Sequence, residues 1–118
     1  MVVQNLNPVV SVVTEELSRN TQKIMGDRLR QIILYGSYAR GDYNEYSDLD
    51  VMVLGDFDEN EYKILESQID KAASDIGLEY DIIVSVMLSK ETLFMSRLPI
   101  SPFYRNVLTE GVAIYGTR

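Results

Sequence analysis

The amino-acid sequence predicts an α/β (α+β) domain in which helices flank a small mixed β-sheet. Short β-branched runs alternate along the chain with longer segments whose apolar residues recur at helical spacing. The chain has 118 residues, which suffice for one hydrophobic core and not for two. Its hydrophobic content of 46% and charged content of 25% are those of ordinary globular proteins. We therefore expect one domain over residues 1–118.

The first half of the chain is predicted to form a helix, a strand, a loop and a second strand. An asparagine–proline pair at residues 7–8 is typical of a helix start, and we expect that helix to run to about Gly26. The run RQIILYG, residues 30–36, predicts a strand that its final glycine ends. The polar segment SYARGDYNEYS, residues 37–47, predicts a short helical turn followed by a loop. The run DLDVMVLG, residues 48–55, predicts the second strand.

The third quarter of the chain is predicted to form a helix, a strand and a short helix. Asp58 and Glu61 have the spacing of a capping box, and they predict a helix start. The apolar face of that helix continues to Gly77, which we expect to end it. EYDIIVSVML, residues 79–88, predicts the third strand, and KETLFMSR, residues 90–97, predicts a short helix.

The C-terminal part is predicted to contain one more helix and one more strand. A serine–proline pair at residues 101–102 is typical of a helix start, and Gly111 follows the expected end of that helix near Thr109. VAIYG, residues 112–116, predicts a short final strand. No internal repeat or linker interrupts this order.

The chain contains no cysteine and no histidine. This composition excludes thiol catalysis, disulfides, zinc sites built from thiolate or imidazole, and any histidine general base. Chemistry at neutral pH must then come from carboxylates, hydroxyls, lysine, arginine or metals with oxygen ligands. A hard cation such as Mg²⁺ fits such a ligand set.

The formal net charge is −7, and the excess acid is concentrated in residues 56–81, which carry nine acids and two lysines. A surface of this sign repels long nucleic acids, so we expect no direct binding of them. A small metal-chelated nucleotide or a basic protein partner fits better. No run of residues has the length of a membrane helix, and the N-terminus lacks the pattern of a signal peptide. We therefore expect a cytoplasmic location and no membrane association.

Three aspartates are candidate metal ligands. Asp48 and Asp50 lie two apart on a predicted strand, so their side chains share one face about 6.6 Å apart. Carboxylates at that separation can converge on metal ions about 3.5–4 Å apart, as two-metal phosphoryl transfer requires. Asp81 begins the third predicted strand, on the same face as Glu79, and would join the pair if the two strands are neighbours. Three crowded acids repel one another, and cations relieve that repulsion.

Gly36 and Ser37 are candidate phosphate-binding residues. Gly36 allows a tight turn after the first strand, and we expect Ser37 to cap the short helical turn SYAR. Exposed amides at a helix start and a serine hydroxyl favour an anion. Arg40, one turn further on, could reach a β- or γ-phosphate oxygen. Each feature alone also fits a plain turn, a surface charge or a solvated strand end, so the hypothesis depends on their joint arrangement.

The stretch GSYARGDYNEYSDLD resembles the active-site motif of the DNA polymerase β-like nucleotidyltransferase superfamily. That motif is Gly-Ser, ten residues, then Asp-x-Asp, and Gly36, Ser37, Asp48 and Asp50 fit it without a gap. Asp81 stands in the context of the third carboxylate that the family carries on a later strand. The whole chain is similar to the small free-standing members called minimal nucleotidyltransferases, and the resemblance implies their polymerase β-like fold.

The resemblance implies transfer of AMP from ATP to a hydroxyl group, with release of pyrophosphate. Asp48, Asp50 and Asp81 would then bind two Mg²⁺ ions as the catalytic and metal-ligating residues. Gly36, Ser37 and Arg40 would bind the nucleotide. Minimal members often pair with a HEPN-domain protein (higher eukaryotes and prokaryotes nucleotide-binding) as antitoxins that adenylylate a tyrosine of that toxin. The alternatives are a small-molecule hydroxyl acceptor, or a catalytically silent module that neutralises its partner by binding alone.

The sequence allows more than one source of the acceptor and more than one role for the loop tyrosines. The chain has no evident acceptor-binding domain, so the acceptor must come on another chain, or the subunit must self-associate as a homo-oligomer. Tyr38, Tyr43 and Tyr46 cluster in the motif loop. They fit loop packing, and they also fit base stacking or contact with a partner.

Overall fold

The computed structural model describes residues 6–116, and a four-stranded sheet in the order β3-β2-β1-β4 lies at its centre. β1 (Leu29–Tyr35) pairs antiparallel with both β2 (Leu49–Gly55) and β4 (Val112–Tyr115). β3 (Val84–Lys90) pairs parallel with β2. This mixed sheet confirms the predicted fold class, and the pairing of β2 with β3 confirms that the second and third predicted strands are neighbours.

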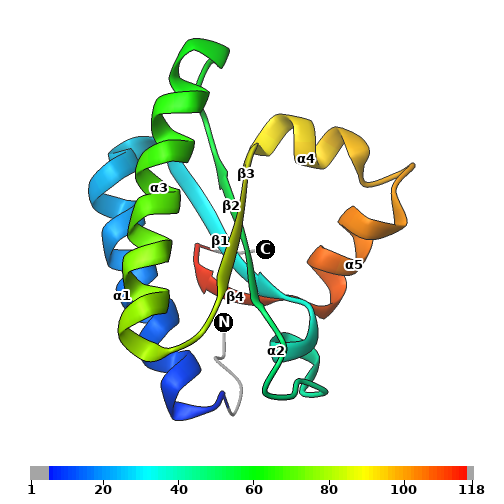
Figure 1. Cartoon of the computed structure of the whole chain (residues 1–118). Helices are drawn as coiled ribbons and strands as arrows, with labels where there is room; N and C mark the ends of the chain where they lie inside the picture. The colour runs from blue at the N-terminus through cyan, green and yellow to red at the C-terminus, as the bar shows by residue number, and fades with distance from the viewer. Residues whose placement is uncertain (1–5, 117–118) are drawn as a thin grey trace.

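Helices cover both faces of the sheet (Figure 1). α1 (Pro8–Met25) and α3 (Glu59–Tyr80) lie on one face, and α4 (Glu91–Arg97) and α5 (Pro102–Glu110) lie on the other. α2 (Ser37–Arg40) is a single turn between β1 and β2. Among the helices of residues 6–116, none combines the length and apolar character needed to cross a bilayer.

Alternation along the strands divides the apolar side chains between two cores. Ile32 and Leu34 of β1 pack in the core under α1 and α3, whereas Ile33 packs with Phe94 and Val107 in the core under α4 and α5. All five side chains are almost completely buried. Burying such a side chain stabilises the fold by about 1.5–3 kcal/mol, so both faces hold the sheet in place.

The predicted starts of α1 and α3 are confirmed by their capping bonds. The Asn7 side chain accepts a hydrogen bond from the Val9 amide at 2.8 Å, and Pro8 follows in the first turn. The Asp58 carboxylate accepts from the Glu61 amide at 2.9 Å, while the Glu61 carboxylate accepts from the Asp58 amide at 3.1 Å. These bonds satisfy amides that have no acceptor within the helix. A short 3-10 turn, η1 (Gly26–Arg28), then links α1 to β1.

The prediction that residues 79–88 form a strand is wrong at its start. α3 continues past Gly77 to Tyr80, and Asp81 closes it in the left-handed conformation with φ 55°. The Gly77 carbonyl accepts from the Ile82 amide at 3.0 Å, and β3 begins only at Val84. A Cβ at Gly77 would lie 2.5 Å from the Ile82 carbonyl oxygen. Gly77 therefore does not end the helix. Its missing side chain lets the segment after α3 pass close to the helix.

Candidate functional site

The Gly36 turn packs directly against the Asp50 carboxylate. β1 ends at Tyr35, which pairs in register with Asp50 of β2. Gly36 follows with φ 75°, a conformation that residues with a Cβ rarely adopt. A Cβ placed on Gly36 would lie 2.5 Å from Oδ2 of Asp50. Glycine therefore lets the backbone of the turn approach the carboxylate, and the structure brings the two halves of the predicted motif together.

Ser37 is the first residue of α2 and not its cap. Gly36 occupies the N-cap position, so the prediction that Ser37 caps the turn is wrong by one residue. The Gly36 carbonyl accepts from the amides of Ala39 and Arg40 at 3.1 and 3.0 Å, which closes the turn. The first amides of a helix have no carbonyl of their own helix to bond. The start of α2 therefore presents amide groups beside Asp50.

Asp48 and Asp50 lie at the start of β2, and the charge of Asp48 acts on the Asp50 carboxyl. β2 begins at Leu49, so the prediction that both aspartates project from one strand is wrong for Asp48. Asp48 is exposed, whereas Asp50 is partly buried. Burial raises the pKa of the Asp50 carboxyl, the charge of Asp48 raises it further, and the Arg40 guanidinium opposes both effects. The pair is thus an unfavourable concentration of negative charge.

Asp50 lines a cavity of about 360 Å³ between the Gly36 turn and α5. Arg40 lines the same cavity, with its guanidinium 3.3 Å from Asp42 and 3.5 Å from Glu110. Burial, followed by the charge of Asp50, raises the pKa of Tyr35 to about 12, so Tyr35 stays neutral there. The cavity therefore combines one guanidinium, helix-start amides and two carboxylates, those of Asp50 and Glu110.

The contribution of α5 to this cavity was missed in the sequence. Asn106 and Glu110 both line the cavity, yet neither belongs to the motif. One signal was present, because Glu110 is an acid in the last turn of a helix, where the macrodipole disfavours negative charge. An acid in that position indicates a cationic partner, and the structure supplies Arg40.

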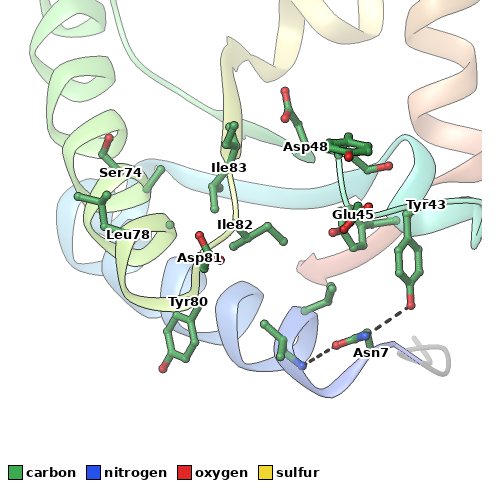
Figure 2. A pocket seen from close by; sticks show the side chains of 18 residues that line it. Asn7, Tyr43, Glu45, Asp48, Ser74, Leu78, Tyr80, Asp81, Ile82 and Ile83 are labelled. Carbon is green, nitrogen blue, oxygen red and sulfur yellow. Dashed lines mark hydrogen bonds between the residues drawn. The ribbon is translucent and has the colours of Figure 1, made fainter.

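Asp48 lines a larger pocket, of about 800 Å³, on the side of the sheet covered by α1 and α3 (Figure 2). Its walls are the start of α1, the motif loop, the C-terminal end of α3 and the segment that leads into β3. Glu45 and Asp81 also line it. Figure 2 shows Asp81 at the end of α3 and Asp48 across the pocket from it.

The three predicted metal-binding aspartates are not brought together. Asp81 lies in the helix-closing turn before β3, and Glu79 lies in α3 rather than on the strand face where it was expected. In β3 the residue level with Asp50 is Ser85, which is not an acid. Within the described part of the chain, no three acidic side chains lie close enough to hold one metal ion. Asp48 and Asp50 therefore remain the paired carboxylates.

Asp48 and Asp50 fit a magnesium ion that a phosphate ligand completes. Mg²⁺ commonly binds through one or two carboxylates, together with substrate phosphates and water. Asp50 has a raised pKa because of burial and the neighbouring charge of Asp48, and a cation would relieve both effects. The donor set consists of carboxylate oxygens only, which suits a hard cation.

Two of the three loop tyrosines pack against each other. The rings of Tyr38 and Tyr43 stack with centroids 4.4 Å apart, and the Asn7 side-chain amide donates to the Tyr43 hydroxyl at 3.5 Å. Loop packing therefore accounts for this pair. Tyr46 is 85% exposed and lines the larger pocket, so its side chain is free to meet a bound molecule.

Comparison of the sequence with known proteins identifies close relatives. The family model described as "Nucleotidyltransferase domain" matches residues 13–114. A Methanocaldococcus jannaschii protein named "Putative protein adenylyltransferase MJ0604" is 40% identical over 88 residues, which cover 75% of this chain and 80% of the relative. Another protein of that organism, "Putative protein adenylyltransferase MJ1305", is 37% identical over 111 residues, which cover 89% of this chain and 70% of the relative.

Two solved structures share the fold. A mutant of the toxin–antitoxin MntA-HpeT superposes with a TM-score of 0.53 and 21% identity, covering 89% of this chain and 74% of that one. A toxin–antitoxin structure with AMP-PNP gives a TM-score of 0.52 and 22% identity, with the same coverage. At these identities the likeness shows the fold alone.

Proposed function

Because the chain belongs to the nucleotidyltransferase domain family, we propose that it transfers AMP from ATP to the hydroxyl group of an acceptor. The observation that carries this proposal is the contact between the Gly36 turn and Asp50, which sets helix-start amides beside a pair of carboxylates. Relatives named as protein adenylyltransferases support ATP as the nucleotide, and so does the shared fold of a structure that contains AMP-PNP.

Asp48 and Asp50 would hold Mg²⁺, with two ions as the two-metal mechanism requires. Bound there, the metal would neutralise phosphate charge and favour the attacking hydroxyl in its deprotonated form. The two carboxylates would hold the metal's positive charge at the start of β2, between the two cavities. Asp81, for which the sequence suggested the third ligand position, is not part of this set because of its position after α3.

Gly36, Ser37 and Arg40 would bind the β- and γ-phosphates in the smaller cavity. The Gly36 turn supplies amides and the Ser37 hydroxyl, and Arg40 supplies a guanidinium that suits phosphate oxygens. Arg40 is already oriented by Asp42 and Glu110, so its side chain is held near the cavity before the nucleotide arrives. Such preorganisation lowers the entropy that binding costs.

The proposed step exchanges one phosphorus–oxygen bond for another. The acceptor oxygen bonds to the α-phosphorus of ATP, the bond from that phosphorus to the bridging oxygen of the β-phosphate breaks, and pyrophosphate leaves with the electron pair. The proton of the hydroxyl passes to solvent. Positioning and charge neutralisation supply most of the catalysis in such reactions.

The acceptor we propose is a tyrosine of a partner toxin, and we expect that toxin to be a HEPN-domain protein. The fold shared with the toxin–antitoxin MntA-HpeT and the names of the relatives support a protein acceptor. A small-molecule hydroxyl is the second candidate acceptor. A silent module that neutralises the toxin by binding alone is the third alternative, because a complete motif is also compatible with binding without turnover.

Labelled ATP distinguishes these functions. The protein is incubated with Mg²⁺, with the partner toxin, which we expect the neighbouring gene to encode, and with ATP labelled at either the α- or the γ-phosphate. We expect α-label and no γ-label on the partner. The Asp48→Asn/Asp50→Asn variant should lose the label, whereas Asp75→Asn, an exposed acid paired with Lys71, should keep it. Transfer of γ-label would contradict nucleotidyl transfer, and protection from toxicity by the double variant would favour the silent module.

A further inference from the structure

The two cavities beside the carboxylate pair differ in charge. The smaller one is lined by Arg40 and by two acids, Asp50 and Glu110, and Glu110 is paired with Arg40. Three acids, Glu45, Asp48 and Asp81, line the larger one, and none of its described lining residues is a lysine or an arginine. A triphosphate is therefore repelled by the larger pocket unless metal ions intervene, whereas a cationic molecule is attracted to it.

The larger pocket also has an apolar rim. Three large side chains line it while remaining mostly in solvent: Tyr46 is 85% exposed, Leu78 is 84% exposed and Ile83 is 68% exposed. They come from three separate segments, namely the motif loop, the last turns of α3 and the strand-leading segment before β3. Figure 2 shows Leu78 and Ile83 on the side of the pocket opposite Glu45. Exposed apolar side chains that line one acidic pocket are typical of an interaction site.

We propose that this pocket docks a basic and apolar segment of a partner protein, and that the acceptor hydroxyl on this segment reaches Asp48. The inference rests on the proposed function and adds to it the surface and the chemistry of the acceptor. The nucleotide approaches the carboxylate pair from the side of Arg40, and the acceptor approaches from the side of Tyr46, Leu78 and Ile83.

Charge complementarity identifies the occupant as a basic polypeptide. Residues 56–81, which include all of α3, carry nine acids and two lysines, and this helix ends at the rim. The part of this segment nearer the pocket, residues 70–81, carries four acids and one lysine, so it is negative and steers cations toward the pocket. A small polycationic sugar would match the acids but would leave the rim of Tyr46, Leu78 and Ile83 uncovered. A polypeptide with apolar and basic side chains covers both.

The wall of the pocket beside Tyr46 is held in place before binding. Tyr38 and Tyr43 stack, and the Asn7 side chain ties the Tyr43 hydroxyl to the start of α1. In the same loop the Asn44 side chain accepts from the Tyr46 amide at 2.8 Å. A loop held by these contacts loses little conformational entropy on binding, so the exposed ring of Tyr46 can contribute to affinity.

Two matched fluorescent peptides test the proposal. Both carry a central tyrosine flanked by leucines, and the remaining positions are lysines in one peptide and glutamates in the other. We expect the lysine peptide to bind the whole chain at least about tenfold more tightly than the glutamate peptide, with a difference that shrinks at high salt. Amide NMR shifts on binding should centre on Tyr46, Leu78 and Ile83, and binding should persist in saturating AMP-PNP with Mg²⁺.

Substitutions at the rim give a sharper test. Leu78→Ser/Ile83→Ser should weaken binding of the lysine peptide at least about tenfold, because two apolar contacts are lost. Ile64→Ser serves as the matched control, because Ile64 is 63% exposed on the same helix and does not line the pocket. It should bind the peptide as the unmodified chain does. Glu45→Lys should weaken binding of the lysine peptide and strengthen that of the glutamate peptide.

The outcomes separate this inference from the proposed function. If the unmodified chain does not bind AMP-PNP, the proposed function is overturned. If AMP-PNP still binds, three results would overturn the docking surface alone. These are equal affinity for the two peptides, displacement of the peptide by AMP-PNP, and unchanged peptide affinity in the rim variants. Shifts at the rim produced by an aminoglycoside but not by the lysine peptide would also overturn it, in favour of a small-molecule acceptor.

Discussion

Gly36 shows how a single residue sets the geometry of the site. It has φ 75°, and a Cβ there would lie 2.5 Å from the Asp50 carboxylate. We predict that Gly36→Ala destabilises the protein by about 1–3 kcal/mol and also abolishes AMP-PNP binding, because the carboxylate must move. Thermal unfolding and calorimetric titration measure the two effects.

Gly26→Ala is the matched control for this substitution. Gly26 has φ 57°, but a Cβ there would meet nothing within 4 Å. Gly26→Ala should therefore lose stability from backbone strain while AMP-PNP binding is retained. Equal nucleotide affinity in the two alanine variants would contradict the importance of the Gly36–Asp50 contact.

Asp50 is predicted to destabilise the free protein. Its pKa is raised in the folded state by burial and by Asp48, so the fold favours the protonated acid, and stability falls as the pH rises past the ordinary aspartate value. Asp50→Asn removes that charge. We expect the variant to melt at a higher temperature than the unmodified chain at pH 7, with the difference shrinking below about pH 4.

The opposite result would contradict the charge argument for Asp50. A lower melting temperature for Asp50→Asn at pH 7 would mean that the ionised carboxylate stabilises the fold. Asp56→Asn, an 80% exposed acid near Arg30, should change the melting temperature little.

At the residue level, the sequence predicted those site residues whose roles depend on their spacing along the chain. Gly36 and Asp50 could be paired in advance because a glycine at the end of one strand and an acid on the next fit a recognisable motif. The position of Asp81 could not, because it depends on a left-handed helix end that no local pattern distinguishes from the start of a strand. Asn106 and Glu110 were invisible because their place at the site depends on how α5 packs.

At the scale of elements, α1 and α3 are joined by a tyrosine–carboxylate bond. The Tyr80 hydroxyl donates to the Glu16 carboxylate, and this hydrogen bond is the main cause that raises the pKa of Tyr80 to about 12. The fold favours the neutral phenol. The contribution of this group to the free energy of unfolding is therefore complete below pH 10 and is lost as the pH rises toward 12. Tyr35, whose pKa is also about 12, adds to the same loss.

We predict that Tyr80→Phe flattens this alkaline decline. The variant should be less stable than the unmodified chain near neutral pH, because it lacks the bond to Glu16. The difference between the two proteins should then shrink between pH 10 and 12. Urea unfolding at a series of pH values measures it, and parallel curves for the two proteins would contradict the prediction.

The start of α3 should depend on its capping box. Asp58→Ala removes the acceptor for the Glu61 amide, and we expect a loss of about 1 kcal/mol in the free energy of unfolding. AMP-PNP affinity should not change, because this end of α3 does not line either cavity. Asp56→Ala is the nearby control and should cost less than about 0.5 kcal/mol. Equal losses in the two variants would argue against the capping role.

Helix starts were the elements best predicted from the sequence. The starts of α1, α3 and α5 have a local chemical cause, the side-chain acceptors of Asn7, Asp58 and Ser101. The starts of α2 and α4 have no such acceptor. The end of α3 was misjudged because a glycine at Gly77 has two physical uses, to end a helix or to allow another segment close by. The choice between these depends on tertiary packing, which residue order alone does not contain.

At the scale of the whole molecule, the sheet places one carboxylate pair between two unlike cavities. The strand order and the parallel pairing of β2 with β3 put the start of β2 at one end of the sheet, with α1 and α3 on one side and α5 on the other (Figure 1). The cavity beside Arg40 suits phosphates, and the acidic pocket with an apolar rim suits a basic acceptor protein. The alternation of helices and strands predicted the sheet and its covering. The pockets could not be predicted, because each is formed by segments far apart in the sequence.

Crystals grown with AMP-PNP and Mn²⁺ in place of Mg²⁺ test the central claim most directly, through anomalous scattering from the manganese. We predict a peak within about 2.2 Å of carboxylate oxygens of Asp48 and Asp50, with the β- and γ-phosphates at the Gly36 turn. A nucleotide bound away from that turn, or manganese bound elsewhere while the two aspartates hold none, would contradict it.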